Sequence, residues 1–385
     1  MARTHNFRHL VVALLSIVIV EWPLAASMAA PLDTASPAEV SRPQTPHAPF
    51  PYAVEEVSFA GAEPNVVLAG SFTRPRATHP LPGVVLVHGS GPTDRDSTVH
   101  GHKPFLVLAD ALSRAGYAVL RYDKRGVGQS SGDFRAATTL DFTGDAAAAM
   151  RYLRTRSEVD SKRVAIVGHS EGGTIAALSL AANDPAAAFV SLNGMIAPYS
   201  EQLPLQEVLT GKDLGANDDY AVIVNAYYDR VMEALRIGND EERLAHMSAL
   251  SSAWQTSFAP GSINHAAASD SLLSRPKLLA SRWFMTLMQL DAPAAIRQGK
   301  APILFLNGST DRQVVAAPNL RVAQEALGTE TPLRRTQLLP GLNHVLQESE
   351  SGSSDDYGTI TQTVSPIAID AVIEFLCLTL GGCQR

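Results

Sequence analysis

The stretch "RVAIVGHSEGGTIAALSL", Arg163–Leu180, holds one serine near its middle, between an apolar block and an alanine-rich segment. Residues 164–167 predict a short buried strand and residues 174–182 predict a helix, so Ser170 stands at the turn between them. A serine hydroxyl is a weak nucleophile unless a base takes its proton and donors stabilise the oxyanion formed on attack. Without such groups elsewhere in the sequence, Ser170 is a loop serine that caps a helix.

The glycines around the serine fit a sharp turn from strand to helix. Gly168 and Gly172 flank Ser170 two residues on each side, and Gly173 lets the helix pack closely behind the turn. The backbone N–H of Glu171, at the start of the helix, would point toward a negative charge that develops beside the serine. This pattern favours a nucleophilic Ser170.

Strands and helices alternate on both sides of this turn. Predicted strands lie at residues 55–61, 65–75, 83–89, 117–123, 188–194, 301–308 and 333–340. Further predicted helices lie at residues 108–116, 141–156, 319–327 and 365–376. The first two strands predict a hairpin, and the repeated alternation that follows is typical of a mainly parallel sheet covered by helices on both faces. We therefore expect an α/β fold.

The pattern changes over residues 198–297, where apolar residues recur at helical spacing without a strong strand signal. We interpret this range as a helical cap, inserted after the sixth core strand and placed over the open end of the sheet. The core then comprises residues 52–197 and 298–385. The large apolar side chains of the cap would form either its own core or a pocket wall: Tyr227, Tyr228, Trp254, Phe258, Trp283, Phe284, Met285 and Met288.

The first 29 residues have the pattern of a secretory signal peptide. Two arginines precede an apolar run over residues 10–20, and a small-residue stretch follows, with cleavage fitting after Ala26 or Ala29. The alternative interpretation is an uncleaved membrane anchor, but the apolar run is too short to span a bilayer, so we expect no stable membrane insertion after processing. Residues 30–51 are rich in proline and predict a mobile leader. We expect the mature protein to be secreted or periplasmic.

The composition excludes some classes of partner. The 385-residue chain has a formal net charge of −7 and no basic cluster, so we expect no nucleic-acid binding. Cys377 and Cys383 would form either a small-loop disulfide in an oxidising compartment or free thiols. The sequence leaves the oligomeric state open. No metal is expected, because the one group of potential ligands lacks the pattern of a metal site: Asp94, Asp96, His100 and His102.

A base and an acid follow the serine in the order of a hydrolase triad. Asp311 stands just beyond the predicted strand at residues 301–308, and His344 stands just beyond the strand at residues 333–340. His344 would accept the proton of Ser170 and return it to the leaving group, while Asp311 would hold the histidine tautomer and stabilise the imidazolium. A turn-forming aspartate and a surface histidine are the alternative interpretations.

Donors for the oxyanion are expected at two places. The third predicted strand ends in His88, Gly89 and Ser90, from where a backbone N–H can face the helix start at Glu171. We assign this donor to Ser90, with Gly89 as the alternative, and expect His88 to be a structural residue that makes hydrogen bonds.

Taken together, these motifs resemble the α/β-hydrolase superfamily, and in particular its branch of serine esterases and serine-aminopeptidase-like hydrolases. The resemblance rests on "HGSGPTDRD" at residues 88–96, "KPFLVLADALSRAGYAVLRYDKRGVGQSSG" at 103–132, "VGHSEGG" at 167–173, "LNGSTDRQV" at 306–314 and "GLNH" at 341–344. It covers about residues 55–195 and 275–380, and it is specific for fold and triad but not for substrate.

The resemblance implies a Ser-Asp-His mechanism through an acyl-enzyme, no cofactor, and oxyanion donors at Ser90 and Glu171. Within the same pattern, Asp123 and Arg125 are expected to pair, and Gly126 and Gly128 to set a turn. The polar segment "QESESGSSDDYGTI" after His344 departs from the family pattern, and would be either part of the pocket mouth or a flexible loop.

The sequence indicates the general class of substrate but not which acyl bond is cleaved. A small-molecule acyl substrate is expected, and short-acyl carboxylic esters fit a generic triad because ester cleavage is its easier reaction. A serine aminopeptidase or a thioesterase would use the same triad, and Glu201 or Glu207 could recognise the α-ammonium of a peptide. A catalytically silent binding protein with this fold is the alternative that is not an enzyme.

Overall fold

The computed structural model describes residues 41–181 and 185–383. The predicted signal peptide, residues 1–29, lies outside the described residues, as do residues 30–40 of the predicted leader. Within the described ranges, no helix combines the length and the apolar character that crossing a membrane requires.

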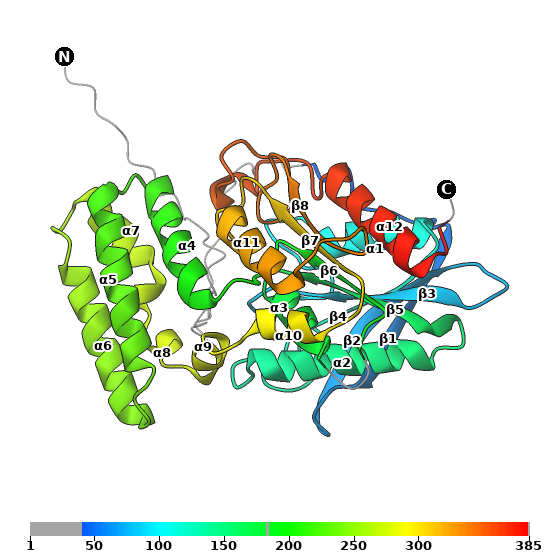
Figure 1. Cartoon of the computed structure of the whole chain (residues 1–385), viewed down its shortest axis with the longest axis horizontal. Helices are drawn as coiled ribbons and strands as arrows, with labels where there is room; N and C mark the ends of the chain where they lie inside the picture. The colour runs from blue at the N-terminus through cyan, green and yellow to red at the C-terminus, as the bar shows by residue number, and fades with distance from the viewer. Residues whose placement is uncertain (1–40, 182–184, 384–385) are drawn as a thin grey trace, which may run out of the picture.

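An eight-stranded sheet forms the centre of the molecule, in the order β1-β2-β4-β3-β5-β6-β7-β8 (Figure 1). The strands are β1 (Tyr52–Ala60), β2 (Val67–Pro75), β3 (Leu81–Val87), β4 (Ala118–Tyr122), β5 (Val159–His169), β6 (Ala188–Leu192), β7 (Ile303–Gly308) and β8 (Arg334–Leu339). β1 and β2 form the predicted hairpin, β2 is antiparallel to β4, and all later pairings are parallel. The predicted fold class is confirmed.

The central strands form where the sequence is continuously apolar. Every residue of β3, β4, β6 and β7 is buried, as expected for parallel strands that are covered on both faces. β5 is longer than predicted, because its first half, before Val164, carries polar residues that hide it from a hydrophobicity pattern. A continuous apolar run, rather than alternation of apolar and polar residues, is thus the sequence signal of these central strands.

Helices cover the sheet in two layers with separate apolar cores (Figure 1). One layer consists of α2 (Thr139–Thr155), α3 (Glu171–Ser179), α10 (Ala292–Gln298) and α11 (Ala316–Leu327). The other layer consists of α1 (Pro104–Arg114) and α12 (Pro366–Leu380). The two layers leave the carboxyl ends of the parallel strands free for a site.

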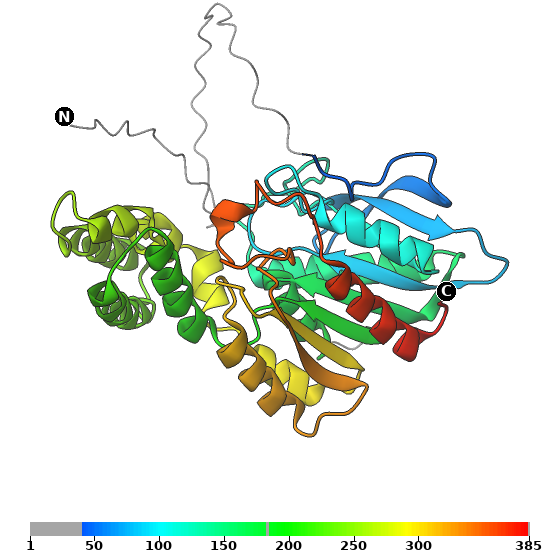
Figure 2. The same ribbon diagram turned by 90° about the horizontal axis from the view of Figure 1, so that it is seen from above.

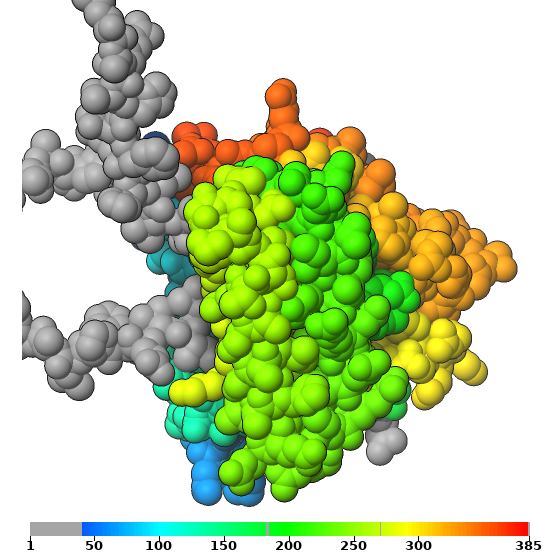
Figure 3. Space-filling model, turned by 90° about the vertical axis from the view of Figure 1, so that its left-hand side faces the viewer, coloured from blue at the N-terminus to red at the C-terminus, as the bar shows by residue number. Residues whose placement is uncertain are grey.

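Between β6 and β7 the chain forms a lobe of helices (Figure 2). They are α4 (Tyr199–Asp213), α5 (Asp218–Ala234), α6 (Asp240–Thr256), α7 (Ile263–Asp270), η1 (Leu272–Ser274), α8 (Pro276–Leu279) and α9 (Arg282–Leu287). The lobe has its own apolar core, which includes the fully buried Trp254 and also contacts Met195 and Val314 after β6 and β7. Figure 3 looks onto its outer surface, coloured green to yellow.

Hydrogen bonds attach the first described residues to the core, and a disulfide holds the last ones. Arg42, within the predicted leader, donates to the carbonyl oxygens of His100, Gly358 and Ile360 at 2.8–3.1 Å. The Gln44 side chain pairs with the backbone of Val364 in both directions, at 2.7 Å and 3.0 Å. At the other end, Cys377 and Cys383 form a disulfide, which resolves the alternative that the sequence left open.

Candidate active site

Four strands end at one edge of the sheet, and a predicted site residue follows each of them. Ser90 follows β3, Ser170 follows β5, Asp311 follows β7 and His344 follows β8. The carboxyl ends of parallel strands meet at the same edge, so residues far apart in the chain come together there.

The turn at Ser170 is as tight as its glycines predict. The serine has φ +56° and ψ −123°, a conformation that residues with a side chain rarely adopt. A Cβ on Gly168 would lie 2.1 Å from the carbonyl oxygen of Gly172, and a Cβ on Gly172 would lie 2.2 Å from that of Val87. Only glycine fits at either position, and the resulting turn projects Ser170 from the end of β5.

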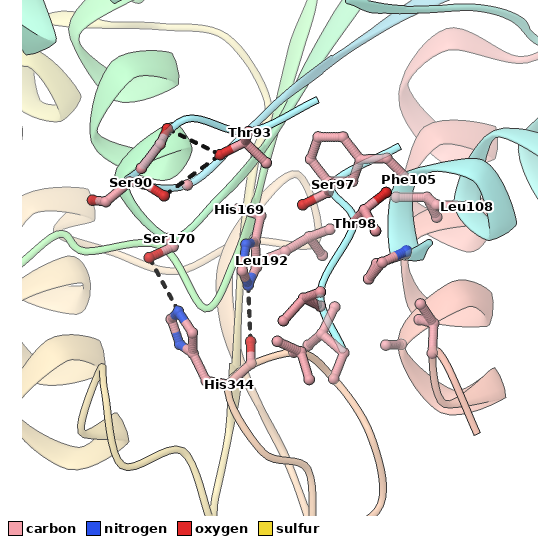
Figure 4. Close-up of a pocket in the computed structure, with 18 of the residues that line it drawn as sticks. Ser90, Thr93, Ser97, Thr98, Phe105, Leu108, His169, Ser170, Leu192 and His344 are labelled. Atoms are coloured by element: carbon pink, nitrogen blue, oxygen red, sulfur yellow. Dashed lines mark hydrogen bonds between the residues drawn. The ribbon is translucent and has the colours of Figure 1, made fainter. Parts of the chain in front are cut away.

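Ser170, His344 and Asp311 form one continuous set of hydrogen bonds. Ser170 Oγ lies 3.1 Å from His344 Nε2 (Figure 4). On the other side of the imidazole, His344 Nδ1 lies 2.9 Å from Asp311 Oδ2 and 3.1 Å from Oδ1. His344 and Asp311 are both buried. This geometry lets the histidine take a proton from the serine at Nε2 while the carboxylate holds Nδ1–H.

The backbone fixes the acid and the base in place. Asp311 Oδ1 accepts hydrogen bonds from the N–H groups of Gln313, at 2.8 Å, and Val314, at 2.9 Å. Asn193 Nδ2 donates to the carbonyl oxygens of Asn343, at 2.9 Å, and His344, at 2.8 Å. Asn193 was not predicted as a site residue. A signal for it was present, since Leu-Asn-Gly occurs both at residues 192–194, where β6 ends, and at residues 306–308, where β7 ends.

Two backbone N–H groups next to Ser170 are the predicted oxyanion donors, at Glu171 and Ser90. Glu171 is the first residue of α3, where a backbone N–H has no intrahelical partner, and no side chain caps this helix start. The Ser90 N–H donates no backbone hydrogen bond within the described part of the chain. A Cβ on Gly89 would lie only 2.9 Å from Ser170 Cβ, so the Gly89–Ser90 peptide lies directly beside the serine.

Within the described residues, neither His169 nor His88 makes a hydrogen bond to the Ser170 hydroxyl. His169 Nε2 contacts the carbonyl oxygen of His344 at 2.8 Å (Figure 4). The centroids of the two imidazole rings are 4.8 Å apart. Burial, helped by the neighbouring His344, lowers the pKa of His169 to about 3. His88 is completely buried, but the prediction that it makes hydrogen bonds is wrong, because neither ring nitrogen has a partner among the described residues. Its ring packs against Phe105 and Tyr122 instead.

The expected pair of Asp123 and Arg125 is not formed. Asp123 accepts hydrogen bonds from the Arg95 side chain, at 2.7 Å, and Arg125 binds Asp145 of α2, also at 2.7 Å. The two side chains therefore point to different neighbours. The turn itself is as predicted, because Gly126 (φ +70°) and Gly128 (φ +56°) both have left-handed backbones.

A pocket of about 310 Å³ opens beside Ser170 and runs between α1 and α12 (Figure 4). Its walls are mainly apolar, and no Asp, Glu, Lys or Arg of the described residues lines it. The lining side chains beyond the triad include Phe105, Leu108, Leu192, Leu346, Ala368 and Val372. Such a pocket accepts an uncharged, apolar group attached to the carbon that Ser170 would attack.

The cap contributes none of its described residues to this pocket. Most of its large apolar side chains form the cap's own core. Glu207 is buried there, 3.1 Å from Tyr220 Oη, and burial raises its pKa. Glu201 is half exposed and pairs with Arg321. Neither carboxylate faces the pocket, so the structure does not bring them to the positions that α-ammonium recognition would require.

The polar segment after His344 is packed against the protein. Gln347 Nε2 lies 3.0 Å from His102 Nε2, and Tyr357 is buried, with its hydroxyl 3.2 Å from Gln313 Nε2. Gln313 itself lines the pocket, so the segment supports the pocket wall. Among the described residues, no group of three or more His, Cys, Asp or Glu side chains is placed to hold a metal ion.

Known proteins share this fold and part of this sequence. The esterase EstD of Thermotoga maritima is 27% identical over 287 residues, which are 74% of this chain and 60% of EstD. The quorum-quenching protein AidA of Acinetobacter baumannii is 26% identical over 255 residues, which are 65% of this chain and 77% of AidA. The crystal structure of the alpha/beta hydrolase GrgF from a Penicillium species has a TM-score of 0.53 at 14% identity, covering 85% of this chain and 99% of GrgF.

A family profile matches more than half of the chain. The profile of the alpha/beta hydrolase family covers residues 84–352, which extend from β3 to the segment after His344. This range includes every predicted site residue as well as the inserted lobe of helices. The chain belongs to the alpha/beta hydrolase family.

Proposed function

We propose that this protein is a serine hydrolase that cleaves carboxylic esters through an acyl-enzyme on Ser170. The observation that carries the proposal is the unbroken contact from Ser170 through His344 to Asp311, with an uncharged pocket beside it. The similarity to the esterase EstD supports it. EstD is matched over only 60% of its length, so the proposal rests first on the site.

The reaction follows from the geometry. Ser170 Oγ attacks the ester carbonyl carbon while His344 Nε2 takes the hydroxyl proton, and the N–H groups of Ser90 and Glu171 bind the oxyanion. The intermediate then collapses, the bond to the alkoxide breaks, and His344 gives its proton to the leaving alcohol. Water, deprotonated by His344, attacks the acyl-enzyme carbonyl, and the proton returns to Ser170 as the acid is released.

We propose short-acyl esters, from acetate to hexanoate, as the preferred substrates. The pocket has no charged side chain among its described lining residues, so an acyl chain enters it without leaving a charge unpaired. A serine aminopeptidase is the second candidate, but Glu201 and Glu207 do not line the pocket. A thioesterase would use the same relay and the same pocket.

The test compares kcat/KM for three panels with one preparation: aryl esters of two to six acyl carbons, long-chain acyl esters, and aminoacyl anilides. We expect the short esters to react fastest and the other two panels to react poorly. An aminoacyl anilide that reacts faster than the best short ester would overturn the ester proposal. A fluorophosphonate probe that fails to label Ser170 would favour the silent binding protein instead.

We also propose that the chain is exported and then processed near Ala26 or Ala29. The support is the sequence pattern of residues 1–29 alone. N-terminal sequencing of the native product is expected to begin at Ser27 or Ala30, outside the cytoplasm, and a product that keeps Met1 would contradict export.

A further inference from the structure

Lys124 is a buried cation that the proposed reaction does not use. Its side chain is 3% exposed, and Nζ lies 4.3 Å from the centre of the Phe142 ring. A buried ammonium is costly unless its charge and its N–H groups are satisfied. Its hydrogen-bond partners are the carbonyl oxygen of Gly89, at 2.7 Å, and Glu171 Oε2, at 3.4 Å. Each partner belongs to one of the two segments that hold the proposed oxyanion donors.

The contact with Gly89 sets the direction of the Ser90 N–H. The Gly89 carbonyl and the Ser90 N–H belong to the same peptide group, and in a trans peptide these two bonds point in opposite directions. Lys124 holds the oxygen on one side, so the N–H points to the other side. This peptide lies directly beside Ser170, as the 2.9 Å between a Gly89 Cβ and Ser170 Cβ indicates.

The contact with Glu171 holds the second donor. Glu171 is 1% exposed, and its Oε1 also accepts hydrogen bonds from Thr139 Oγ1, at 2.6 Å, and Trp283 Nε1, at 3.0 Å. Its side chain is therefore fixed at the start of α3, whose first N–H is the proposed second donor. Lys124 thus connects the two donor segments through one ammonium group.

We propose that Lys124 is a positioning residue for the oxyanion hole, which aligns the Gly89–Ser90 peptide with the start of α3 and strengthens the Ser90 N–H as a donor. The strengthening arises because a cation bound to an amide oxygen draws electron density from the amide nitrogen, as in other chains of hydrogen bonds. The inference rests on the proposed ester hydrolysis at Ser170 and names a residue outside its proposed triad and donors. Lys124 does not touch the substrate, and it acts through the peptide that does.

The test is Lys124→Met, which keeps an unbranched chain but removes the ammonium. Oxyanion donors act mainly in the transition state, so we expect kcat for a short ester to fall about tenfold to a hundredfold, less than the loss of a whole donor, while KM stays within about threefold. Binding of n-butylboronic acid, which forms a tetrahedral adduct with a serine hydroxyl, is expected to weaken by the same factor as kcat. If Lys124 had a purely structural role, the fall in kcat and the loss of boronate affinity would not be equal.

Arg125→Met is the matched control, because Arg125 is also a buried cation, 3% exposed, paired with Asp145. We expect it to lower stability without the selective loss in kcat and boronate affinity. If Lys124→Met does not fold, because Glu171 is left buried and unpaired, the double variant Lys124→Met/Glu171→Gln removes both charges and is measured in the same way. A folded variant with kcat within about threefold of the wild type, or with unchanged boronate affinity, overturns the proposal.

Ser170→Ala in the same assay separates the two proposals. If it abolishes hydrolysis while Lys124→Met retains full kcat, the role of Lys124 is wrong and ester hydrolysis at Ser170 stands. If Ser170→Ala remains active, the proposed function fails, and the oxyanion role of Lys124 fails with it.

Discussion

Ser170 has a backbone conformation that costs free energy, and the glycines around it are what permit that conformation. Such strain is kept where a side chain must project into a site. We expect Ser170→Ala to lower kcat/KM for short esters by at least about a thousandfold, because the members of a triad act as a unit. The fold is expected to stay intact, because alanine occupies the same turn with one atom less.

Steady-state kinetics and circular dichroism of the purified variant check this prediction. Ser179→Ala, at the far end of the same helix α3, is the control and is expected to keep full activity. A Ser170→Ala protein that keeps more than about a hundredth of the wild-type kcat/KM would rule out the nucleophile assignment.

The buried ring of His88 makes stability depend on pH. Burial, helped by the nearby Lys124, lowers its pKa from 6.5 to about 3. Between pH 6.5 and about pH 3, His88 carries a proton in the unfolded chain but not in the folded protein. Protonation therefore favours the unfolded chain, so the free energy of unfolding is highest above pH 6.5 and decreases as the pH falls below that value. The loss approaches about 1.4 kcal/mol for each pH unit below the unfolded pKa.

We therefore expect His88→Phe to reduce the difference in unfolding free energy between pH 7.5 and pH 5.5 by about 1 kcal/mol. Urea denaturation at the two pH values measures it, and His79→Phe, at an exposed histidine, is the control. Equal pH dependence in the two variants would show that His88 titrates normally.

The helix α12 forms one wall of the pocket. Ala368, Ile369 and Val372 of this helix line it, and Ala368 is only 1% exposed. A larger side chain at position 368 would occupy the space of an acyl chain. Each methylene excluded from an apolar environment costs about 0.8 kcal/mol, or about fourfold in kcat/KM. We expect Ala368→Phe to lower the ratio of hexanoate to acetate hydrolysis at least about tenfold.

The measurement is kcat/KM for acetyl, butyryl and hexanoyl aryl esters. Ile367→Phe is the matched control, because Ile367 is the neighbouring residue on α12 and is 45% exposed on its outer side. If both variants change the hexanoate-to-acetate ratio equally, the acyl chain does not lie between α1 and α12.

The elements also show which features the sequence could predict. Continuous apolar runs predicted the buried strands, and the order of Ser170, Asp311 and His344 predicted residues that the structure brings together. The pocket was not predictable in the same way, because its walls come from several loops and two helices distant in the chain. The pairing of Asp123 with Arg95 was missed for a similar reason, since the partner lies 28 positions away and the nearer arginine points elsewhere.

The segment near Arg42 joins two loops that lie far apart in the sequence. The loop before α1 supplies pocket residues 97–99, and the segment before α12 supplies Val364. Arg42 binds a carbonyl oxygen next to the first, at His100, and two next to the second, at Gly358 and Ile360. The predicted mobile leader therefore includes, from residue 41 on, a part that braces the pocket.

This arrangement leads to a prediction about where the chain can be shortened. A protein that begins at residue 41 keeps Arg42 and Gln44, whereas one that begins at residue 46 loses both. Hydrogen bonds from a charged group contribute about 1.5–3 kcal/mol, so we expect the shorter protein to lose about 2 kcal/mol of unfolding free energy relative to the longer one.

Arg42→Ala in the longer protein should reproduce most of this loss, and Arg76→Ala, at an exposed arginine, should not. Urea denaturation of the four proteins measures the differences, and hexanoate kcat/KM shows whether the pocket loosens with them. Equal stability of the proteins that begin at residues 41 and 46 would mean that Arg42 only rests on the surface, and that the two pocket loops hold each other without it.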